Sequence, residues 1–238
     1  MIVVVRKNNI VLIGLVFLLL VTIYSLTVGA DKASQAVNSQ EQQKIVILDP
    51  GHGGEDPGAV SKYSGIKEKD VNLKIALKAK KLLEREGYKV ILTREEDKLE
   101  YLPETRNITE KRRQDLNRRK KMMDEAGADI VVSIHLNMFE QAKYYGAQTF
   151  FPPGSPESQR LAMCIQKSLK ELVDPTNERA AASKKEPIII LKDYKTTTTI
   201  VECGFLSNPD EEKKLALDGH QEKLAFAIKE GIKEYFSR

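Results

Sequence analysis

The chain has 238 residues, of which 41% are hydrophobic and 30% are charged, and its formal net charge is +4. This length suits one substantial folded domain with a short additional segment, and the sequence contains no internal repeat or long low-complexity tract. Without Arg6 and Lys7 in the N-terminal segment, 36 basic residues remain against 34 acidic ones. This near-neutral balance argues against a nucleic-acid partner.

The N-terminal segment is apolar and differs in composition from the rest of the chain. No charged residue occurs between Ile10 and Ala30, and the preceding basic residues are Arg6 and Lys7. The most apolar part, residues 10–23, lies between the lengths expected of a cleaved signal peptide and of a membrane-spanning helix. Basic residues ahead of such a segment keep the N-terminus in the cytoplasm and carry the remainder outward. We therefore expect an exported, extracytoplasmic domain that is either membrane-anchored or secreted, and we favour the anchor.

Three parts follow from this pattern. They are a signal-anchor or signal peptide at 1–30, a polar linker at 31–43 and a folded domain at 44–238.

Apolar runs alternate with helical patterns throughout the third part. Runs predicted to be strands are residues 44–49, 88–93, 128–137, 147–151, 187–191 and 197–205. Patterns predicted to be helices are 71–86 with Asp70 as its N-cap, about 110–127, 157–172, 209–217 and 219–236. Continuous apolar strands separated by helices predict an α/β fold. We expect a mainly parallel, twisted sheet of about six strands with helices on both faces, in three layers.

Polar residues occur where three of the predicted strands end. The stretch "ILDPGHGG" places His52 on a glycine-rich loop after the first strand, "SIHLN" places His135 at the end of the third, and Glu202 lies near the end of the last. In parallel sheets, ligands bind beyond the carboxyl ends of the strands. Two imidazoles and one carboxylate form the ligand set of a catalytic zinc ion with a fourth position open to water.

A second carboxylate is needed if one acid binds the metal and another moves a proton. Glu202 is one of the two. Near His52, the acidic candidates for the other are Asp49, Glu55, Asp56, Glu68 and Asp70. Spacing does not choose among them, because the ligands come from separate elements. By position alone, Glu68 is more typical of a surface acid near a helix N-terminus.

Four segments, "LDPGHGG", "EKDVNLKIA", "SIHLN" and "VECGFLSNPDEE", occur in the order typical of one enzyme family. From about Lys44 to the C-terminus the chain resembles the zinc-dependent N-acetylmuramoyl-L-alanine amidases of the amidase-3 type. This resemblance implies that His52, Glu68 and His135 hold one zinc ion and that Glu202 is the catalytic carboxylate. The chain is most similar to the short, membrane-anchored sporulation and germination-specific amidases that act on spore-cortex peptidoglycan.

The resemblance implies hydrolysis of the amide bond between N-acetylmuramic acid and L-alanine in peptidoglycan, as a step toward muramic-δ-lactam. The alternatives are a zinc carboxypeptidase-like peptidase that trims stem peptides and a non-catalytic wall-binding protein. No wall-binding module is recognisable in the sequence. We therefore expect recruitment to the polymer by the N-terminal membrane segment or by an accessory protein.

Three further features have simple expected roles. We expect Cys164 and Cys203 to be small buried residues rather than a disulfide. Arg94, just past the second predicted strand, is at the edge where it could reach a substrate carboxylate, and a surface ion pair is at least as typical of such a residue. The stretch from Arg106 to Lys121 holds eight basic residues and is expected to be a solvated helix face, with contact to anionic wall polymer or lipid headgroups as the alternative.

Overall fold

The computed structural model describes residues 16–25, 43–184 and 195–237. Residues 16–25 are helical, and no helix in these described ranges is long and apolar enough to cross a membrane. Contacts between residues divide the chain into Met1–Gln43 and Lys44–Arg238. The predicted N-terminal segment and linker fall mostly outside the described residues and stay predictions, and the predicted strand at 187–191 also lies outside them.

The second unit contains one six-stranded sheet with the strand order β2–β1–β3–β6–β4–β5. Its strands are β1 (Ile45–Pro50), β2 (Lys89–Leu92), β3 (Ile130–Asn137), β4 (Gln148–Phe151), β5 (Ala182–Ser183) and β6 (Thr197–Phe205). The pairing of β4 with β6 is antiparallel and the other pairings are parallel. The predicted mainly parallel α/β sheet is confirmed.

Five helices accompany the sheet within residues 43–184 and 195–237. They are α2 (Glu68–Arg85), α3 (Ile108–Glu125), α4 (Pro156–Leu172), α5 (Pro209–Ala216) and α6 (Asp218–Phe236). Asn107, Ser155 and Asn208 cap α3, α4 and α5 by accepting hydrogen bonds from backbone N–H groups of the first turn. The predicted cap at Asp70 is wrong, because α2 starts after Lys67 without a side-chain cap. Glu68 is therefore a helical residue.

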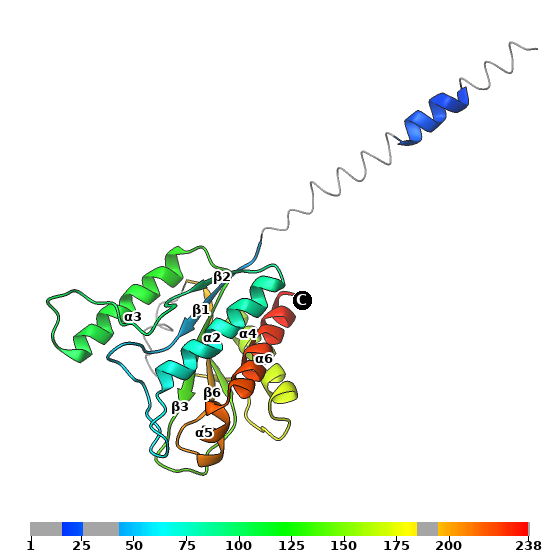
Figure 1. Ribbon diagram of the computed structural model, residues 1–238. Coiled ribbons are helices and arrows are strands. Elements are labelled where there is room, and N and C mark those ends of the chain that lie inside the picture. The colour runs from blue at the N-terminus through cyan, green and yellow to red at the C-terminus, as the bar shows by residue number, and fades with distance from the viewer. Residues whose placement is uncertain (1–15, 26–42, 185–194, 238) are drawn as a thin grey trace, which may run out of the picture. The chain divides into compact units, whose positions relative to one another are not determined.

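The two faces of the sheet are covered differently. One face is covered by α2, α4 and α6 (Figure 1). These helices pack on it through a large apolar cluster that includes Leu48 and Val132. The opposite face lies under α3, where the apolar cluster has only four buried members, Ile47, Met123, Val131 and Ile200. Side chains alternate between faces along each strand, so Ser133 and His135 share the α3 face with Val131. Polar side chains thus occupy the α3 face toward the carboxyl edge of the sheet.

Strand register brings the predicted site residues to this same edge. Asp49 on β1 pairs with Ser133 on β3, and His135 on β3 pairs with Glu202 on β6. Residues paired in this way on neighbouring strands project toward the same face. His135 and Glu202 therefore emerge side by side at the edge where the loop after β1 begins.

Candidate functional site

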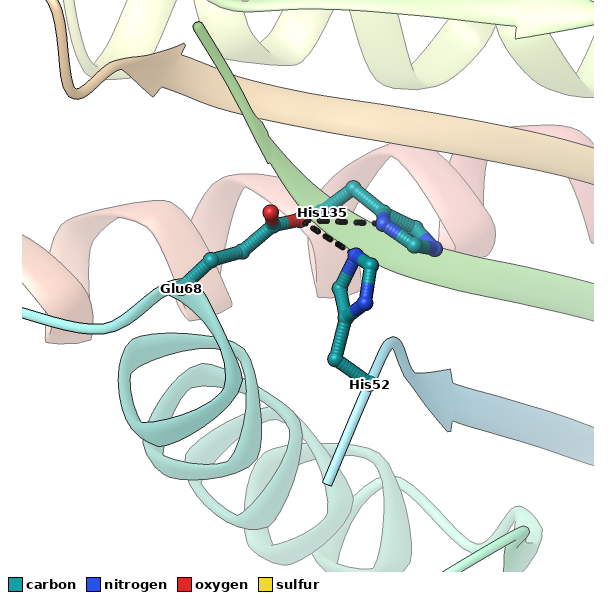
Figure 2. Close-up of side chains that lie close together, drawn as sticks. All are labelled: His52, Glu68 and His135. Carbon is teal, nitrogen blue, oxygen red and sulfur yellow. Dashed lines mark hydrogen bonds and ion pairs between the residues drawn. The ribbon is translucent and has the colours of Figure 1, made fainter. Parts of the chain in front are cut away.

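Three of the predicted residues lie in one cluster. His52 comes from the loop after β1, Glu68 is the first residue of α2, and His135 is on β3 (Figure 2). Each offers one ligand atom, and these atoms lie within 4.8 Å of one another. The Oε1 atom of Glu68 is 3.0 Å from Nδ1 of His135 and 3.3 Å from Nε2 of His52. Two nitrogens and one carboxylate oxygen therefore converge as a metal site requires.

Two glycines make room for these side chains. A Cβ atom added at Gly51 would lie 2.2 Å from Cε1 of His135, and one added at Gly58 would lie 2.6 Å from Oε2 of Glu68. Cβ atoms essentially never lie this close to other atoms, so His135 or Glu68 would have to move. The glycines are therefore needed for the site itself, because the ring of His135 and the carboxylate of Glu68 occupy the space that side chains at positions 51 and 58 would fill.

His52 itself has φ 64°, the left-handed conformation that a residue with a side chain rarely adopts. Its Nδ1 atom is 2.8 Å from Oδ2 of Asp56, and Asp56 also forms an ion pair of 2.6 Å with Arg112. Burial alone would lower the pKa of His52, but hydrogen bonds and charges from Asp56 and Glu68 outweigh it and raise the pKa to about 9. Asp56 thus leaves Nε2 of His52 directed toward Glu68.

Glu68 is only 3% exposed, so the surface position suggested by its place in the sequence is wrong. Its Oε2 accepts a hydrogen bond from the amide of Ala59 and its Oε1 accepts one from the amide of Leu136. Burial raises the pKa of this carboxyl, but His135 and His52 outweigh burial and hold the pKa far below its ordinary value. Glu68 is therefore an anion placed between two imidazoles.

Glu202 faces the cluster from β6. Its Oε2 is buried and has no hydrogen-bond partner within residues 43–184 and 195–237. Burial raises the pKa of Glu202 above its ordinary value, the charge of His135 lowers it, and the charge of Glu68 raises it again. A buried carboxylate oxygen without a partner is costly. Its open acceptor fits a site that receives a water molecule or substrate beside a cation.

The other acidic candidates have different partners. Asp49 is 2% exposed and pairs with Arg119 at 3.0 Å. Burial raises the pKa of Asp49, but Arg119, Thr93 and Ser133 outweigh it and lower the pKa to about 2. Glu55 is exposed and pairs with Lys111, and Asp70 is exposed in the first turn of α2. Of the five acids near His52, Glu68 alone joins the cluster with the two histidines.

The surface ion pair expected of Arg94 is wrong. This residue is 2% exposed and donates hydrogen bonds to the backbone carbonyls of Pro50, Gly51, Lys69 and Glu96. The basic stretch is likewise not simply a solvated face. Its ion pairs include Lys111–Glu55, Arg112–Asp56, Arg113–Glu110, Arg118–Glu100, Arg118–Asp115, Arg119–Asp49, Arg119–Asp115 and Lys120–Asp124. Helical spacing was a local signal for three of the acidic partners, because Glu110, Asp115 and Asp124 lie three or four residues from a basic residue on the same helix.

Cys164 and Cys203 are 6% and 3% exposed, and no disulfide joins them. The expectation that both are buried small residues is confirmed.

Residues 46–234 match the family model for N-acetylmuramoyl-L-alanine amidases of the Amidase_3 type. The chain belongs to this amidase family. It is 36% identical over 195 residues to the germination-specific N-acetylmuramoyl-L-alanine amidase of Bacillus subtilis, a match covering 82% of this chain and 80% of that protein. The resemblance inferred from the four segments is therefore confirmed.

Solved structures of amidases agree with the fold. The CwlD amidase from Clostridioides difficile, solved in complex with the GerS lipoprotein, is 47% identical with a TM-score of 0.80, covering 82% of this chain and 99% of that one. An N-acetylmuramoyl-L-alanine amidase from Clostridium difficile 630 is 30% identical with a TM-score of 0.72, covering 83% and 98% respectively. The amidase domain described here is thus similar to nearly the whole of both solved chains.

Proposed function

We propose that the chain is a zinc-dependent amidase that hydrolyses the bond between N-acetylmuramic acid and L-alanine in peptidoglycan, with spore cortex as its substrate. The observation that carries this proposal is the cluster of His52, Glu68 and His135 beside the unpartnered Oε2 of Glu202. Family membership supports the reaction, and similarity to a germination-specific amidase supports the cortex as substrate.

In this proposal, the metal ligands are Nε2 of His52, Oε1 of Glu68 and Nδ1 of His135. The donor set fits zinc, because two neutral imidazoles and one carboxylate are ligands that zinc accepts in catalytic sites. A zinc ion held there would acidify a water molecule and polarise the scissile carbonyl. The hydrogen bond from His52 to Asp56 would orient the ring and fix its tautomer, as partners of metal-bound histidines commonly do.

Glu202 would move the proton. Its Oε2 accepts a proton from the attacking water and returns it to the nitrogen of L-alanine as that amine leaves. A raised pKa suits both steps, because a carboxylate whose pKa lies nearer neutrality is a stronger base and still a competent acid. The same residue therefore serves as base and acid in succession.

A zinc peptidase that trims stem peptides would use a similar set of residues, and a wall-binding protein would not turn over at all. Product analysis separates the three possibilities. Peptidoglycan incubated with the full-length protein should yield whole stem peptides with a new L-alanine amino terminus, detected by mass spectrometry. Release of single amino acids would favour the peptidase. Polymer that stays intact in the presence of stoichiometric zinc, even after a membrane fraction is added, would favour the wall-binding protein.

Recruitment is also proposed. Residues 1–30 would hold the domain at the outer surface of a membrane, and an accessory protein would assist it there. The support is the solved complex of the CwlD amidase with the GerS lipoprotein. Activity that the purified chain lacks and a membrane fraction restores would support an accessory partner, whereas full activity of the purified chain would argue against it.

A further inference from the structure

The guanidinium of Arg119, on α3, is 1% exposed and donates to four acceptors. Two are carboxylates, with Nε 2.7 Å from Asp115 and Nη1 3.0 Å from Asp49. The other two are backbone carbonyls, with Nη1 2.8 Å from Pro50 and Nη2 2.7 Å from His52. These carbonyls lie on either side of Gly51. One arginine fork therefore binds the loop that carries His52 at two points.

Arg94 completes this arrangement from the end of β2. Its Nε lies 2.9 Å from the carbonyl of Pro50 and its Nη2 lies 3.1 Å from the carbonyl of Gly51. The carbonyls of three consecutive residues, 50 to 52, thus each accept from a buried guanidinium. His52 needs this support, because its φ of 64° is disfavoured for a residue with a side chain and persists only where the surroundings hold it.

Stability alone does not explain a buried arginine at this position. The buried residues of α3 are Asp115, Arg119 and Met123, so two of the three are charged. Buried ion pairs contribute little net stability compared with apolar residues of the same volume. An apolar residue could not donate the hydrogen bonds that Arg119 makes to the backbone carbonyls of Pro50 and His52.

We propose that Arg119 is a positioning residue for the metal site. It holds the backbone at residues 50–52 so that Nε2 of His52 faces Oε1 of Glu68, and Asp115 orients its guanidinium. Arg119 acts through His52 and is not placed against the substrate. This inference rests on the proposed zinc site formed by His52, Glu68 and His135.

The test compares Arg119→Lys with Arg118→Lys in the full-length protein. Lysine keeps the positive charge near Asp49 and Asp115, but one ammonium group cannot reach two carbonyls and two carboxylates together. Arg118 is a matched control, because it also pairs with Asp115, at 3.2 Å, while its other partners are Glu100 and the backbone carbonyl of Thr93 rather than residues 50–52. Zinc affinity is measured by calorimetry, the unfolding temperature is measured on metal-free protein, and the Co²⁺-substituted forms are compared by visible absorption.

We expect Arg119→Lys to raise the dissociation constant for zinc about 10- to 100-fold, the range seen when partners of metal ligands are removed, and to shift the cobalt bands. Arg118→Lys should match the wild type in both. A lowered unfolding temperature with unchanged zinc affinity and an unchanged cobalt spectrum would overturn the inference, since Arg119 would then be only structural.

Two further outcomes of this test bear on the inference. If the wild type binds no zinc, the proposed metal site fails and this inference fails with it. If Arg119→Lys does not fold, Asp115→Asn replaces it, because the amide keeps the volume but loses the charge that orients Nε of Arg119. Weaker zinc binding by Asp115→Asn than by Arg118→Lys would support the inference, and wild-type affinity would overturn it.

Discussion

Nδ1 of His52 lies 2.8 Å from Oδ2 of Asp56, four residues further along the same loop. The carboxylate is an acceptor, so it keeps a proton on Nδ1 and leaves Nε2 as the nitrogen available to a metal. The proposed zinc site therefore depends on a residue that is not itself a ligand.

We expect Asp56→Asn to weaken zinc binding about 10-fold, because a neutral amide holds the His52 tautomer less firmly. Calorimetric titration of the metal-free protein with zinc measures the change. Glu55→Gln is the control, since Glu55 is the adjacent acid and is exposed. Equal zinc affinity in Asp56→Asn and Glu55→Gln would refute a role for Asp56 in orienting the ring.

Zinc binding should release a proton near neutral pH. In the metal-free protein the pKa of His52 is raised to about 9, so its imidazole is protonated at pH 7 and must lose that proton to bind a metal. Zinc affinity should therefore rise with pH until about 9 and level off above it. Calorimetry in buffers of different ionisation enthalpy counts the protons, and a count of zero at pH 7 would contradict a protonated His52.

Gly51→Ala should abolish zinc binding while the fold persists. The added Cβ would lie 2.2 Å from Cε1 of His135, so the imidazole must move away from Glu68. Gly219→Ala is a suitable control, because no atom lies within 4 Å of its added Cβ. Circular dichroism checks the fold and metal analysis after dialysis checks the site. Full zinc content in Gly51→Ala would show that His135 is not a ligand.

The α/β sheet was predictable because its strands are continuous apolar runs separated by helical patterns. His52 and His135 were predictable because each follows such a run, where parallel strands place their carboxyl ends at one edge. The antiparallel direction of β4 was not predictable, because a strand of four residues carries no signal of its direction in the sheet. Its neighbour β5 has only two residues and was missed.

The assignment of Glu68 as a ligand depended on the family resemblance. Its partners His52 and His135 are 16 and 67 residues away in the sequence, and no local pattern relates the three residues. The roles of Arg94 and Arg119 were not predictable at all. Their main partners are backbone carbonyls of residues 50–52, which lie 43 to 69 residues away, and every residue type carries a backbone carbonyl, so the sequence does not indicate which one is bound.

The free energy of unfolding should decrease in acid as the carboxylate of Asp49 becomes protonated. Its pKa is lowered from 3.8 to about 2, because Arg119 and the hydroxyls of Thr93 and Ser133 outweigh the effect of burial. A lowered pKa in the folded state means that this stability is present above pH 4 and is lost as pH falls through 2. The shift corresponds to about 2 kcal/mol.

Urea unfolding of the wild type and of Asp49→Asn between pH 5 and pH 2 measures this contribution. The difference in unfolding free energy between the two proteins should shrink by most of that amount over this range. A constant difference would mean that Asp49 does not titrate between its folded and unfolded states in this way.

The most direct test of the central claim is zinc content and amidase turnover of Glu202→Gln beside the wild type. We expect one zinc per chain in both proteins, because His52, Glu68 and His135 are unchanged. Turnover should fall about 10²- to 10⁴-fold, the usual contribution of a general base. Loss of zinc from Glu202→Gln would make Glu202 a ligand and contradict the assignment, as would turnover equal to that of the wild type.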